Sequence, residues 1–580
     1  MTSKITYDVS TPNPHTHYFD VVLSLEGLSE MTTDLQMAVW TPGSYMVREY
    51  AKNVEQIKVY GEDGSELPAE KLNKNNWRVN NAGKNFKFQY KVYAFEETVR
   101  TGFLDESHAS IIPAALFIFP VGIDVPVLIQ FHPFFIWKNI STSLEMVDND
   151  QWKRIAPNSD ILIDSPIEIG NHSIHKFIAA GVEHELAIYG EGNYNTEKIE
   201  SDIIKIINAE VSVFRHHPCT DDKYSNNRYV FILQNSNTGR GGLEHLNSTS
   251  LIYKRLGYTP ESSYREFISL VSHEYFHLWN VKRLRPAALG PFDYTSENYT
   301  TSLWIAEGFT NYYDDIILRR ANIITEQIYF EIAEKNINDV ENAPGKSIHP
   351  VGYASFDAWI KYYRQNENSY NAQINYYTKG GILAMLLDMQ IIAHSDGTHS
   401  LDEVMREAYE TFYLKEDRGY TETEFKLILE KYTGVDLTSF YADHVFGTAA
   451  IDYQKYFAPL GLRLENVIKD TVETDLGISI NDKNIITQIR KNSSGERGKL
   501  NVNDEIIAIN NFRYTPTLLS TITENIFSGA FLICIVNRGG LIQSFEIQLQ
   551  KTDKVNYKII VDASISERQK KIYAKWLHLS

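Results

Sequence analysis

The residues best suited to metal chemistry are two histidines and a glutamate in one short segment. His273-Glu274-Tyr275-Phe276-His277 follows the pattern H-E-x-x-H. Residues four positions apart lie on one face of a helix, so both imidazoles can reach one metal ion at roughly 2.0–2.1 Å. Glu274 lies beside them and is placed to take a proton from a metal-bound water. The segment therefore predicts a hydrolytic zinc site.

A third ligand is expected on a carboxylate further along the chain. Zinc sites of hydrolases bind three protein ligands and keep one position open for water. Glu307 has Trp304 and Phe309 as neighbours, and a carboxylate buried among apolar groups without a partner is costly. Because a metal ion would remove that cost, we predict one zinc ion per chain, bound by His273, His277 and Glu307.

Other residue types narrow the description of this site. Asn311 and Asp314 follow Glu307 by about one and two helical turns, and either could orient a ligating histidine. The two cysteines, Cys219 and Cys534, are far apart. This spacing excludes a disulfide framework and a cysteine-rich metal site.

Helical periodicity is expected to hold these residues in place. Apolar residues recur at three- and four-residue intervals over 262–280, 303–321 and 380–394. Thr259 and Pro260 predict the start of the first helix, with Thr259 as N-cap and Pro260 in the first turn. This helix has apolar residues on more than one face, so we expect it to be buried.

Strand patterns flank the helical region on both sides. Short apolar or alternating runs at 21–25, 86–90 and 127–131 predict an N-terminal antiparallel β domain. Similar runs at 485–489, 505–509 and 531–535 predict a small β-rich module near the C-terminus. The fold class is therefore multidomain α+β. The predicted boundaries are 1–165 for the β domain, 166–460 for the catalytic domain with its helical part from about 320, 461–555 for the module, and 556–580 for a tail.

Composition and charge describe an ordinary globular protein of several domains. The chain has 580 residues, of which 43% are hydrophobic and 22% charged. Its formal net charge of -18 argues against nucleic acid as a partner, because phosphate binding needs clustered Lys and Arg. The start of the chain lacks an apolar signal core, and the most apolar stretch, 114–131, is interrupted by Pro, Gly and Asp. We therefore expect a cytoplasmic protein without a membrane span.

Two stretches together resemble a known group of peptidases. Residues 273–280 read H-E-Y-F-H-L-W-N, and residues 303–310 read L-W-I-A-E-G-F-T. Both are similar to the glycyl aminopeptidase family of the gluzincins, which combines a β-rich N-terminal domain, a thermolysin-like catalytic domain and a C-terminal PDZ domain. The interval between His277 and Glu307 is longer than in the large aminopeptidases related to leukotriene hydrolase, which favours this family. The resemblance implies a zinc metallopeptidase that removes one small residue, Gly or Ala, from peptides with a free N-terminus.

The resemblance also implies an amine-binding motif. Segment 241–245, Gly-Gly-Leu-Glu-His, resembles the Gly-x-Met-Glu-Asn motif of related aminopeptidases, whose Glu binds the free α-amine. Leu243 and His245 replace the Met and Asn of that motif, but the carboxylate remains. The amine-binding role therefore passes to Glu244, with Gly242, Leu243 and His245 beside it at the substrate. A plain surface loop is the alternative.

An oxyanion donor is implied in the same way. Tyr377-Thr378-Lys379-Gly380 resembles the Tyr-x-Lys-Gly of those relatives, whose Tyr hydroxyl stabilises the tetrahedral intermediate. Such a donor is typically worth about 2.7–4 kcal/mol of barrier. The neighbouring Tyr376 is the alternative donor.

The C-terminal module resembles a PDZ domain. Residues 476–480, Leu-Gly-Ile-Ser-Ile, resemble the carboxylate-binding turn and first groove strand, and 498–510 resemble the G-x-L-x-x-x-D-x-I-x-x-I-N stretch. PDZ domains bind a peptide C-terminus as an added strand, which implies a second peptide partner. A closed or unused groove is the alternative.

The resemblance implies a mechanism with three residue roles, and the sequence leaves three alternative functions open. Glu274 acts as base and then acid, Tyr377 holds the oxyanion, and Glu244 anchors the amine. If Glu244 meets no amine, the enzyme is an endopeptidase or removes dipeptides. A non-peptide substrate is the second alternative, and a PDZ peptide-binding scaffold with vestigial catalysis is the third. The intact motifs argue against the scaffold.

Overall fold

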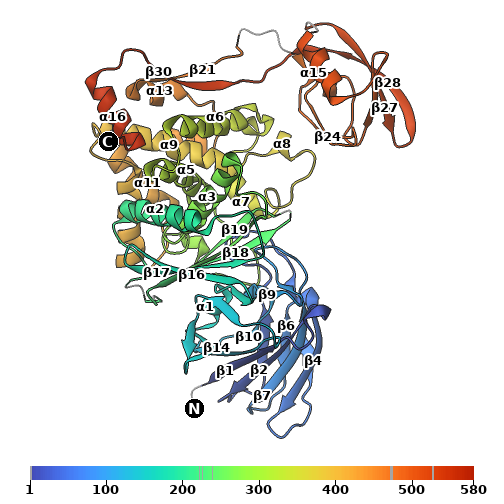
Figure 1. Cartoon of the computed structure of the whole chain (residues 1–580), viewed down its shortest axis with the longest axis vertical. Helices are drawn as coiled ribbons and strands as arrows, with labels where there is room; N and C mark the ends of the chain where they lie inside the picture. Colours follow the sequence, from blue (N-terminus) through green and yellow to red (C-terminus); the bar gives the residue numbers. More distant parts are fainter. Residues whose placement is uncertain are drawn as a thin grey trace. The chain divides into compact units, whose positions relative to one another are not determined.

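The chain forms two compact units. The structure is a computed structural model of the whole chain (Figure 1) and describes residues 3–220, 223–224, 226–237, 239–469, 474–525 and 528–579. The first unit comprises Met1–Thr300, Tyr313–Ile324 and Asp402–Phe425, and the second comprises Thr301–Tyr312, Thr325–Leu401 and Lys426–Ser580. Both contain strands and helices, which confirms the multidomain α+β class. Among the described residues, no helix is both long and apolar enough to cross a membrane.

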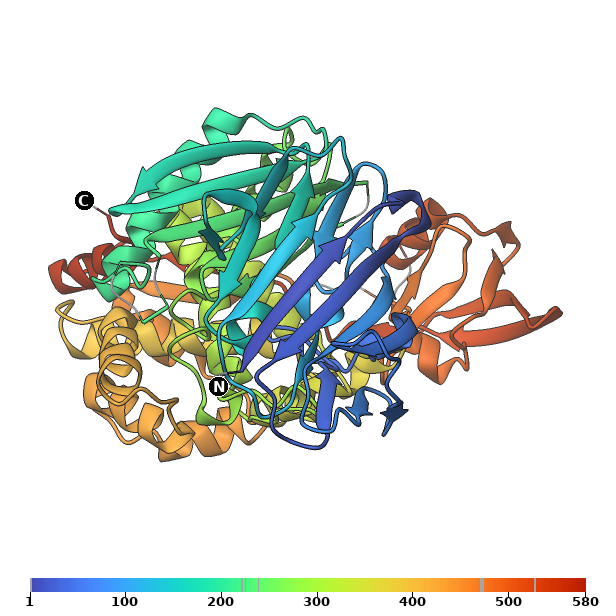
Figure 2. The same cartoon turned by 90° about the horizontal axis from the view of Figure 1, so that it is seen from below.

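The N-terminal part of the first unit is built on a seven-stranded sheet. The strand order is β13-β14-β11-β1-β2-β7-β4, and the long strands lie side by side in Figure 2. β1 is antiparallel to β2 but parallel to β11. The predicted antiparallel arrangement is therefore wrong at this pair. The long segment between β1 and β11 serves as the crossover connection that a parallel pair requires. The strands are β1 (Lys4–Ser10), β2 (Tyr18–Glu26), β4 (Val54–Gly61), β7 (Phe86–Tyr93), β11 (Val127–His132), β13 (Glu145–Val147) and β14 (Asp150–Ala156).

Two four-stranded sheets complete this β-rich part, which confirms the predicted N-terminal β domain. Alternate residues of β1, namely Ile5, Tyr7 and Val9, are buried in a core shared with the neighbouring strands. The sheet orders are β10-β3-β6-β5 and β12-β15-β9-β8. Their strands are β3 (Thr33–Met37), β5 (Ala69–Lys71), β6 (Asn76–Val79), β8 (Phe103–Leu104), β9 (His108–Ile111), β10 (Ile118–Pro120), β12 (Asn139–Thr142) and β15 (Ile167–Gly170), and helix α1 (Ser159–Ile163) follows β14.

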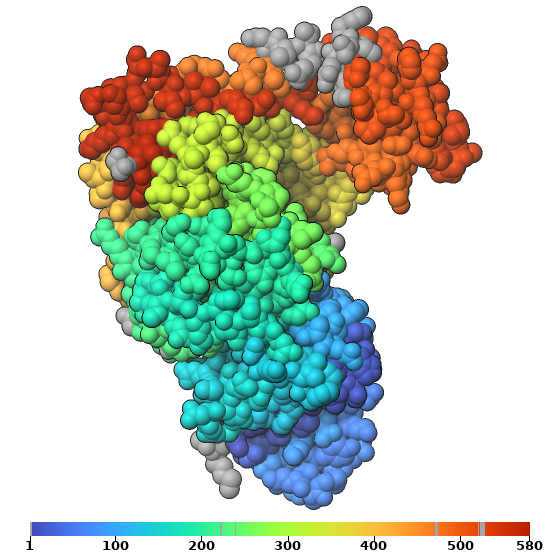
Figure 3. Space-filling model, viewed as in Figure 1, coloured from blue at the N-terminus to red at the C-terminus, as the bar shows by residue number. Residues whose placement is uncertain are grey.

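A five-stranded sheet in the same unit supports the chemistry-bearing helix. Its order is β16-β17-β18-β20-β19, and the edge strand β19 is antiparallel to β20. Helix α3 packs on α2 and contacts β19 and β20, and the earlier residues of this part form a continuous teal surface in Figure 3. The elements are β16 (Ser173–Ala179), β17 (Val182–Tyr189), α2 (Thr196–Phe214), β18 (Arg228–Ser236), β19 (Gly241–His245), β20 (Ser248–Lys254) and α3 (Glu261–Phe276).

Helix α3 is buried on several faces, as its apolar pattern predicted. Phe267, Val271 and Phe276 are all fully buried. The predicted N-cap is wrong: the helix begins at Glu261, and Pro260 occupies the N-cap position without a side-chain cap. The Thr259 hydroxyl is engaged elsewhere, because it accepts a hydrogen bond from the side chain of Asn193.

The second unit is mainly helical in the part that carries Glu307, which confirms the predicted helical region. The expected single helix over 303–321 is divided into α4 and α5 at Glu307, although the backbone bonds Glu307 N–H to Leu303 O and Asn311 N–H to Glu307 O continue across the break. α9 contacts α4, α6 and α7. The helices that follow α3 along the chain are α4 (Leu303–Ala306), α5 (Gly308–Arg320), α6 (Glu326–Asn342), α7 (Val351–Phe356), α8 (Ser369–Ala372), α9 (Tyr376–His394), α10 (Leu401–Ala408), α11 (Glu422–Thr433), α12 (Thr438–Phe440) and α13 (Tyr453–Phe457).

The last part of the second unit is a small β module with its own apolar core. Its sheet order is β26-β25-β27-β28, and β23 pairs with β24. β21 and β30 pair with each other, so the segment expected as a tail supplies a strand, and it also forms helix α16. The elements are β21 (Leu462–Asn466), β22 (Thr474–Asp475), β23 (Ile478–Ile480), β24 (Ile486–Ile489), α14 (Ser494–Arg497), β25 (Glu505–Ile509), β26 (Phe512–Arg513), α15 (Pro516–Asn525), β27 (Phe531–Arg538), β28 (Leu541–Gln548), β29 (Gln550–Lys551), β30 (Tyr557–Val561) and α16 (Glu567–Leu577).

Candidate metal centre

Hydrogen bonds fix the tautomers of both histidines at the end of α3. The Nδ1–H of His273 donates to Asp314 Oδ2 at 2.9 Å, and the Nδ1–H of His277 donates to Asn280 O at 2.8 Å. Of the two candidates for orienting a histidine, Asn311 and Asp314, it is Asp314 that binds His273. A proton held on Nδ1 leaves Nε2 as the nitrogen that can face a metal ion.

A strained turn after α3 supplies the second of these bonds. The φ of Val281 is 107°, in a region that β-branched residues rarely adopt. The turn returns the chain so that Lys282 N–H donates to His277 O at 3.1 Å. The strain is therefore located where the backbone orients a metal-facing imidazole.

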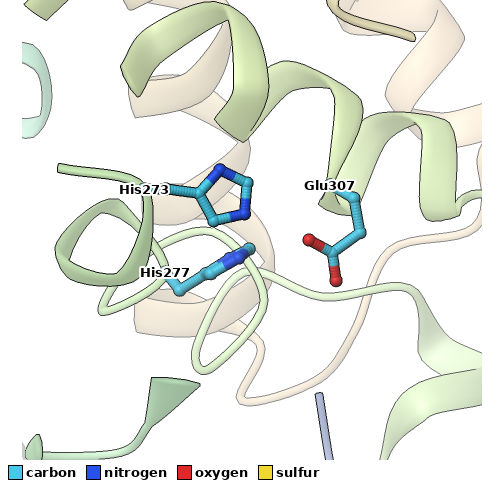
Figure 4. A group of neighbouring side chains, drawn as sticks. All are labelled: His273, His277 and Glu307. Atoms are coloured by element: carbon cyan, nitrogen blue, oxygen red, sulfur yellow. The ribbon is translucent and has the colours of Figure 1, made fainter. Parts of the chain in front are cut away.

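Glu307 completes a group with the donor set of a zinc site. The ligand atoms of His273, His277 and Glu307 all lie within 4.8 Å of one another, and the two rings and the carboxylate point toward one another in Figure 4. His277 and Glu307 are buried, each with about 1% of its surface exposed. Two imidazole nitrogens and one carboxylate oxygen match a His₂Glu zinc site with room for a fourth ligand, so the residues present fit the metal.

Glu244 and Glu274 form a second group with His277. One ligand atom of each of these three residues lies within 4.8 Å of the other two. Two carboxylates at that separation repel each other by roughly 3–4 kcal/mol at an effective dielectric constant of about 20. The electrostatics of the site therefore favour a bound cation, either a metal ion or an ammonium group.

A glycine of β19 allows Glu274 to reach its place. A β-carbon at Gly242 would lie 1.9 Å from Glu274 Oε1, so the carboxylate lies directly against the backbone of the strand. Any side chain at this position would displace Glu274. Gly242 thus acts as a backbone platform, while Leu243 beside it is buried in a small apolar cluster with Val99 and Ile252.

The strand end that carries Glu244 is fixed by Asp164. This carboxylate accepts from His245 Nδ1 at 3.0 Å, from Leu246 N–H at 2.9 Å and from Lys282 Nζ at 2.9 Å. Burial opposes ionisation, but the charge of Lys282 and the bond from His245 lower the pKa of Asp164 below its ordinary value. His245 is therefore placed as a support of β19, which differs from the substrate contact that the motif implied.

Tyr275, inside the H-E-x-x-H segment, is the centre of a buried hydrogen-bond chain. Its hydroxyl lies 2.7 Å from His217 Nε2 and 2.8 Å from His184 Nε2. His217 Nδ1 accepts from Cys219 N–H, and His184 Nδ1 lies 3.0 Å from Val182 O. The proton order is therefore determined: His217 Nε2–H donates to Tyr275, Tyr275 donates to His184 Nε2, and His184 Nδ1–H donates to Val182 O.

Burial holds both histidines of this hydrogen-bond network, His184 and His217, in the neutral form. Burial lowers the pKa of His184 to about 4. Burial, together with the neighbouring His184, lowers the pKa of His217 to about 3. The network joins α3 to β17 and to the segment after α2, so it holds the helix of the metal-facing histidines against the sheet.

The two candidate tyrosines begin helix α9. Asn375 caps this helix by accepting from Tyr377 N–H at 2.9 Å, and the rings of Tyr376 and Tyr377 stack at 4.8 Å. Tyr376 is fully buried, whereas Tyr377 is partly exposed. Loss of hydration in this partly buried position raises the pKa of Tyr377 well above its ordinary value, and the negative charge of Glu307 raises it further. The Tyr377 hydroxyl therefore stays protonated at neutral pH and lies in the electrostatic field of Glu307.

Two glycines allow the helices of Glu307 and Tyr377 to approach closely. A β-carbon at Gly308 would lie 2.5 Å from Gly380 Cα, and one at Gly380 would lie 2.9 Å from Gly308 Cα. Gly308 directly follows the proposed ligand Glu307, and Gly380 ends the Tyr-x-Lys-Gly motif that begins at Tyr377. Close backbone contact thus explains why both motifs contain glycine.

Sequence reasoning missed several residues around this group. Asp164 accepts hydrogen bonds from the end of the strand that carries Glu244, and His184 and His217 bind the hydroxyl of Tyr275. These contacts arise only in the tertiary fold, and no local sequence pattern marks the residues. Gly43 lies against Glu244, and its place in a Thr-Pro-Gly-Ser turn was a signal of tight backbone geometry.

Comparisons with known proteins extend over the same regions. The M61 glycyl aminopeptidase model matches residues 266–383, and the model of the peptidase M61 N-terminal domain matches residues 6–171. An aminopeptidase N family protein from Idiomarina loihiensis is similar over 99% of this chain and 100% of its own, with a TM-score of 0.91 and 28% identity. An M1 zinc metallopeptidase from Deinococcus radiodurans is similar over 75% of this chain and 91% of its own, with a TM-score of 0.44 and 12% identity. Among curated proteins no sequence matches. The Idiomarina structure therefore shares the fold of the entire chain.

Proposed function

This chain belongs to the M61 glycyl aminopeptidase family, and we propose that it is a zinc aminopeptidase that removes one small residue, Gly or Ala, from the free N-terminus of peptides. The observation that carries the proposal is the position of Glu244, whose carboxylate lies within 4.8 Å of Glu274 and His277. An α-amine and the carbonyl carbon of the same residue are separated by only two bonds. A carboxylate that anchors the amine this close to a base therefore selects the first peptide bond.

Each proposed role follows from the position of a side chain. His273, His277 and Glu307 would hold zinc, which supplies Lewis-acid activation of the scissile carbonyl and of water. Glu274 takes the proton of the attacking water and delivers it to the leaving amine. The protonated hydroxyl of Tyr377 donates a hydrogen bond to the developing oxyanion.

The test compares substrates with free and blocked amines. Gly- and Ala-p-nitroanilide are assayed beside their N-acetylated forms, with Glu274→Gln as the blank and zinc measured per chain by mass spectrometry. We expect about one zinc per chain and cleavage of the free-amine substrates alone, abolished in the variant. Equal cleavage of both forms would contradict the amine anchor and favour an endopeptidase. A chain without zinc and without activity would favour a peptide-binding scaffold, and cleavage of neither peptide form by a zinc-loaded chain would favour a non-peptide substrate.

A groove in the C-terminal module supports a second proposed activity, the binding of a peptide C-terminus. A cavity of about 600 Å³ in this module is lined by Leu476 and Gly477, which precede β23, by Ile478 of β23, and by Pro516 and Leu519 of α15. Among the described residues, β23 pairs with β24 alone, so its other edge can accept an added strand.

The proposed carboxylate site rests on the resemblance of 476–480 to a carboxylate-binding turn, and not on a surplus of positive charge. Arg490 and Lys554 line the cavity, but each forms an ion pair with Asp475 at 2.8 Å, and Arg490 also pairs with Asp553. We expect the intact protein to bind a fluorescent hexapeptide that ends in valine, and to bind its C-terminal amide at least tenfold more weakly. Equal binding of acid and amide would contradict a carboxylate site.

A further inference from the structure

A turn of the N-terminal domain covers the proposed amine anchor. Gly43 has a φ of 83°, and a β-carbon built on it would lie 2.4 Å from Glu244 Oε2, 2.5 Å from Oε1 and 2.6 Å from Cδ. All three atoms of the carboxylate therefore lie against the α-carbon of Gly43. Contacts below 3.0 Å cannot be relieved without moving the carboxylate.

The same carboxylate lies close to the proposed reacting groups. Glu244 is 4% exposed, and one of its oxygens lies within 4.8 Å of ligand atoms of Glu274 and His277. The carboxylate therefore lies against the backbone of the turn and close to the groups that would act on the peptide bond. The turn closes one approach to it, and the proximity of Glu274 and His277 favours the approach of an ammonium group from their side.

The turn is held firmly in the fold of the first unit. Ser44 N–H donates to Thr41 O at 3.1 Å, and Arg48 Nη2 donates to Ser44 Oγ at 2.9 Å. Trp40 is fully buried and donates from Nε1 to Asp293 O at 2.8 Å. These hydrogen bonds fix the position of the turn, because moving Gly43 would break the bond between Ser44 and Thr41.

We propose that the turn Thr41–Ser44 is the wall that closes the amine end of the substrate site, with Gly43 as its specificity-determining residue. The inference rests on the proposed function of Glu244. A residue that preceded the substrate amine would have to occupy the space of Gly43. The N-terminal domain therefore restricts the enzyme to the removal of single residues, and the absence of a side chain at residue 43 lets Glu244 reach the amine.

The first test replaces Gly43 and uses a matched glycine as control. Gly64 has a φ of 80° and nothing within 4 Å of its β-carbon position, so Gly64→Ala carries the same backbone strain without the steric contact. We expect Gly43→Ala to lower kcat/KM for Ala-p-nitroanilide at least tenfold, chiefly through KM, with zinc content unchanged. Gly64→Ala should stay within twofold of the natural chain. Equal values for the two variants would overturn the proposal.

A double-variant cycle shows whether the effect passes through the carboxylate. Glu244→Asp shortens the side chain and withdraws the carboxylate from residue 43. In that background Gly43→Ala should cost less than threefold, because the contact has been removed. A full tenfold loss in both backgrounds would overturn the proposal, since the methyl group would then act by another route.

The natural chain gives a test that requires no variant. With Ala-Ala-p-nitroanilide we expect the release of free alanine before p-nitroaniline and no Ala-Ala dipeptide, as measured by mass spectrometry. Release of the dipeptide would overturn the wall. A failure of the proposed function is distinguishable, because it would appear as equal cleavage of free and acetylated Ala-p-nitroanilide by the natural chain.

Discussion

Removing the hydroxyl of Tyr275 should destabilise the protein strongly, although the substitution to phenylalanine preserves the ring. The hydroxyl bridges His217 Nε2–H and His184 Nε2, and all three residues are buried. In Tyr275→Phe both nitrogens lose their partner in a place closed to water. A buried polar group left without a partner costs about 1–3 kcal/mol, so two of them predict a loss of about 2–6 kcal/mol in the free energy of unfolding.

A neighbouring tyrosine provides the matched control. Tyr229 packs against Tyr275 with ring centroids 4.8 Å apart, and it is also fully buried. Its hydroxyl has no hydrogen-bond partner among the described residues. Tyr229→Phe therefore removes a buried hydroxyl without breaking a bond, and we expect it to be neutral or stabilising.

The assay is urea unfolding followed by tryptophan fluorescence. Trp279 lies 5.9 Å from the rings of both Tyr275 and His217, so it reports the environment of this network. Because a chain of several domains need not unfold in one step, the transition that includes α3 is compared among the variants. A loss below about 1 kcal/mol in Tyr275→Phe, or a loss equal to that of Tyr229→Phe, would refute the assigned hydrogen-bond chain.

Three further predictions concern the metal, the oxyanion and pH. Asp314→Ala should weaken zinc binding about 10–100-fold, measured by competition with a chelator, because the first metal-facing imidazole loses its orienting partner; unchanged affinity would contradict this role. Tyr377→Phe should lower kcat about 10²–10³-fold with zinc retained, whereas Tyr376→Phe should have little effect; the reverse order would identify Tyr376 as the donor. The folded-state pKa values of His184 and His217 lie at about 4 and 3, below the unfolded value of about 6.5. Their contribution to the free energy of unfolding is therefore complete above about pH 6.5. As the pH drops from there toward each folded-state pKa, the contribution of each histidine falls by about 1.4 kcal/mol per pH unit. Unfolding measured in urea between about pH 7 and pH 4.5 checks this slope, and a flat profile would contradict it.

Local patterns were sufficient where chemistry follows from spacing along one helix. The H-E-x-x-H segment and the apolar periodicity of α3 both depend on neighbours within two turns. The structure brings His273 and His277 together with Glu307, as the cost of burying an unpaired carboxylate suggested. Helix α16 carried a local signal that was overlooked, since Ser566 and Gln569 form a capping box at its start.

Features that depend on distant segments could not be predicted from the sequence. Nothing near Glu244 indicates that Gly43 lies on its carboxylate, or that Asp164 fixes the end of its strand. The roles of Tyr275 depend on histidines in two other segments, and a tyrosine inside a buried helix has no distinctive spacing. The parallel pairing of β1 with β11 was missed for the same reason, because it joins strands that no hairpin connects.

The contact between Gly308 and Gly380 has a consequence for how such a sequence can change over time. A methyl group on either residue would meet the backbone of the other. Neither glycine can therefore be replaced first, and replacing both would make the collision worse. Glu307 and Tyr377 can each be lost by one substitution, but the separation of the helices that carry them cannot be adjusted by small steps. A lineage could therefore discard this chemistry abruptly, whereas gradual retuning of its geometry would have to begin elsewhere in the fold.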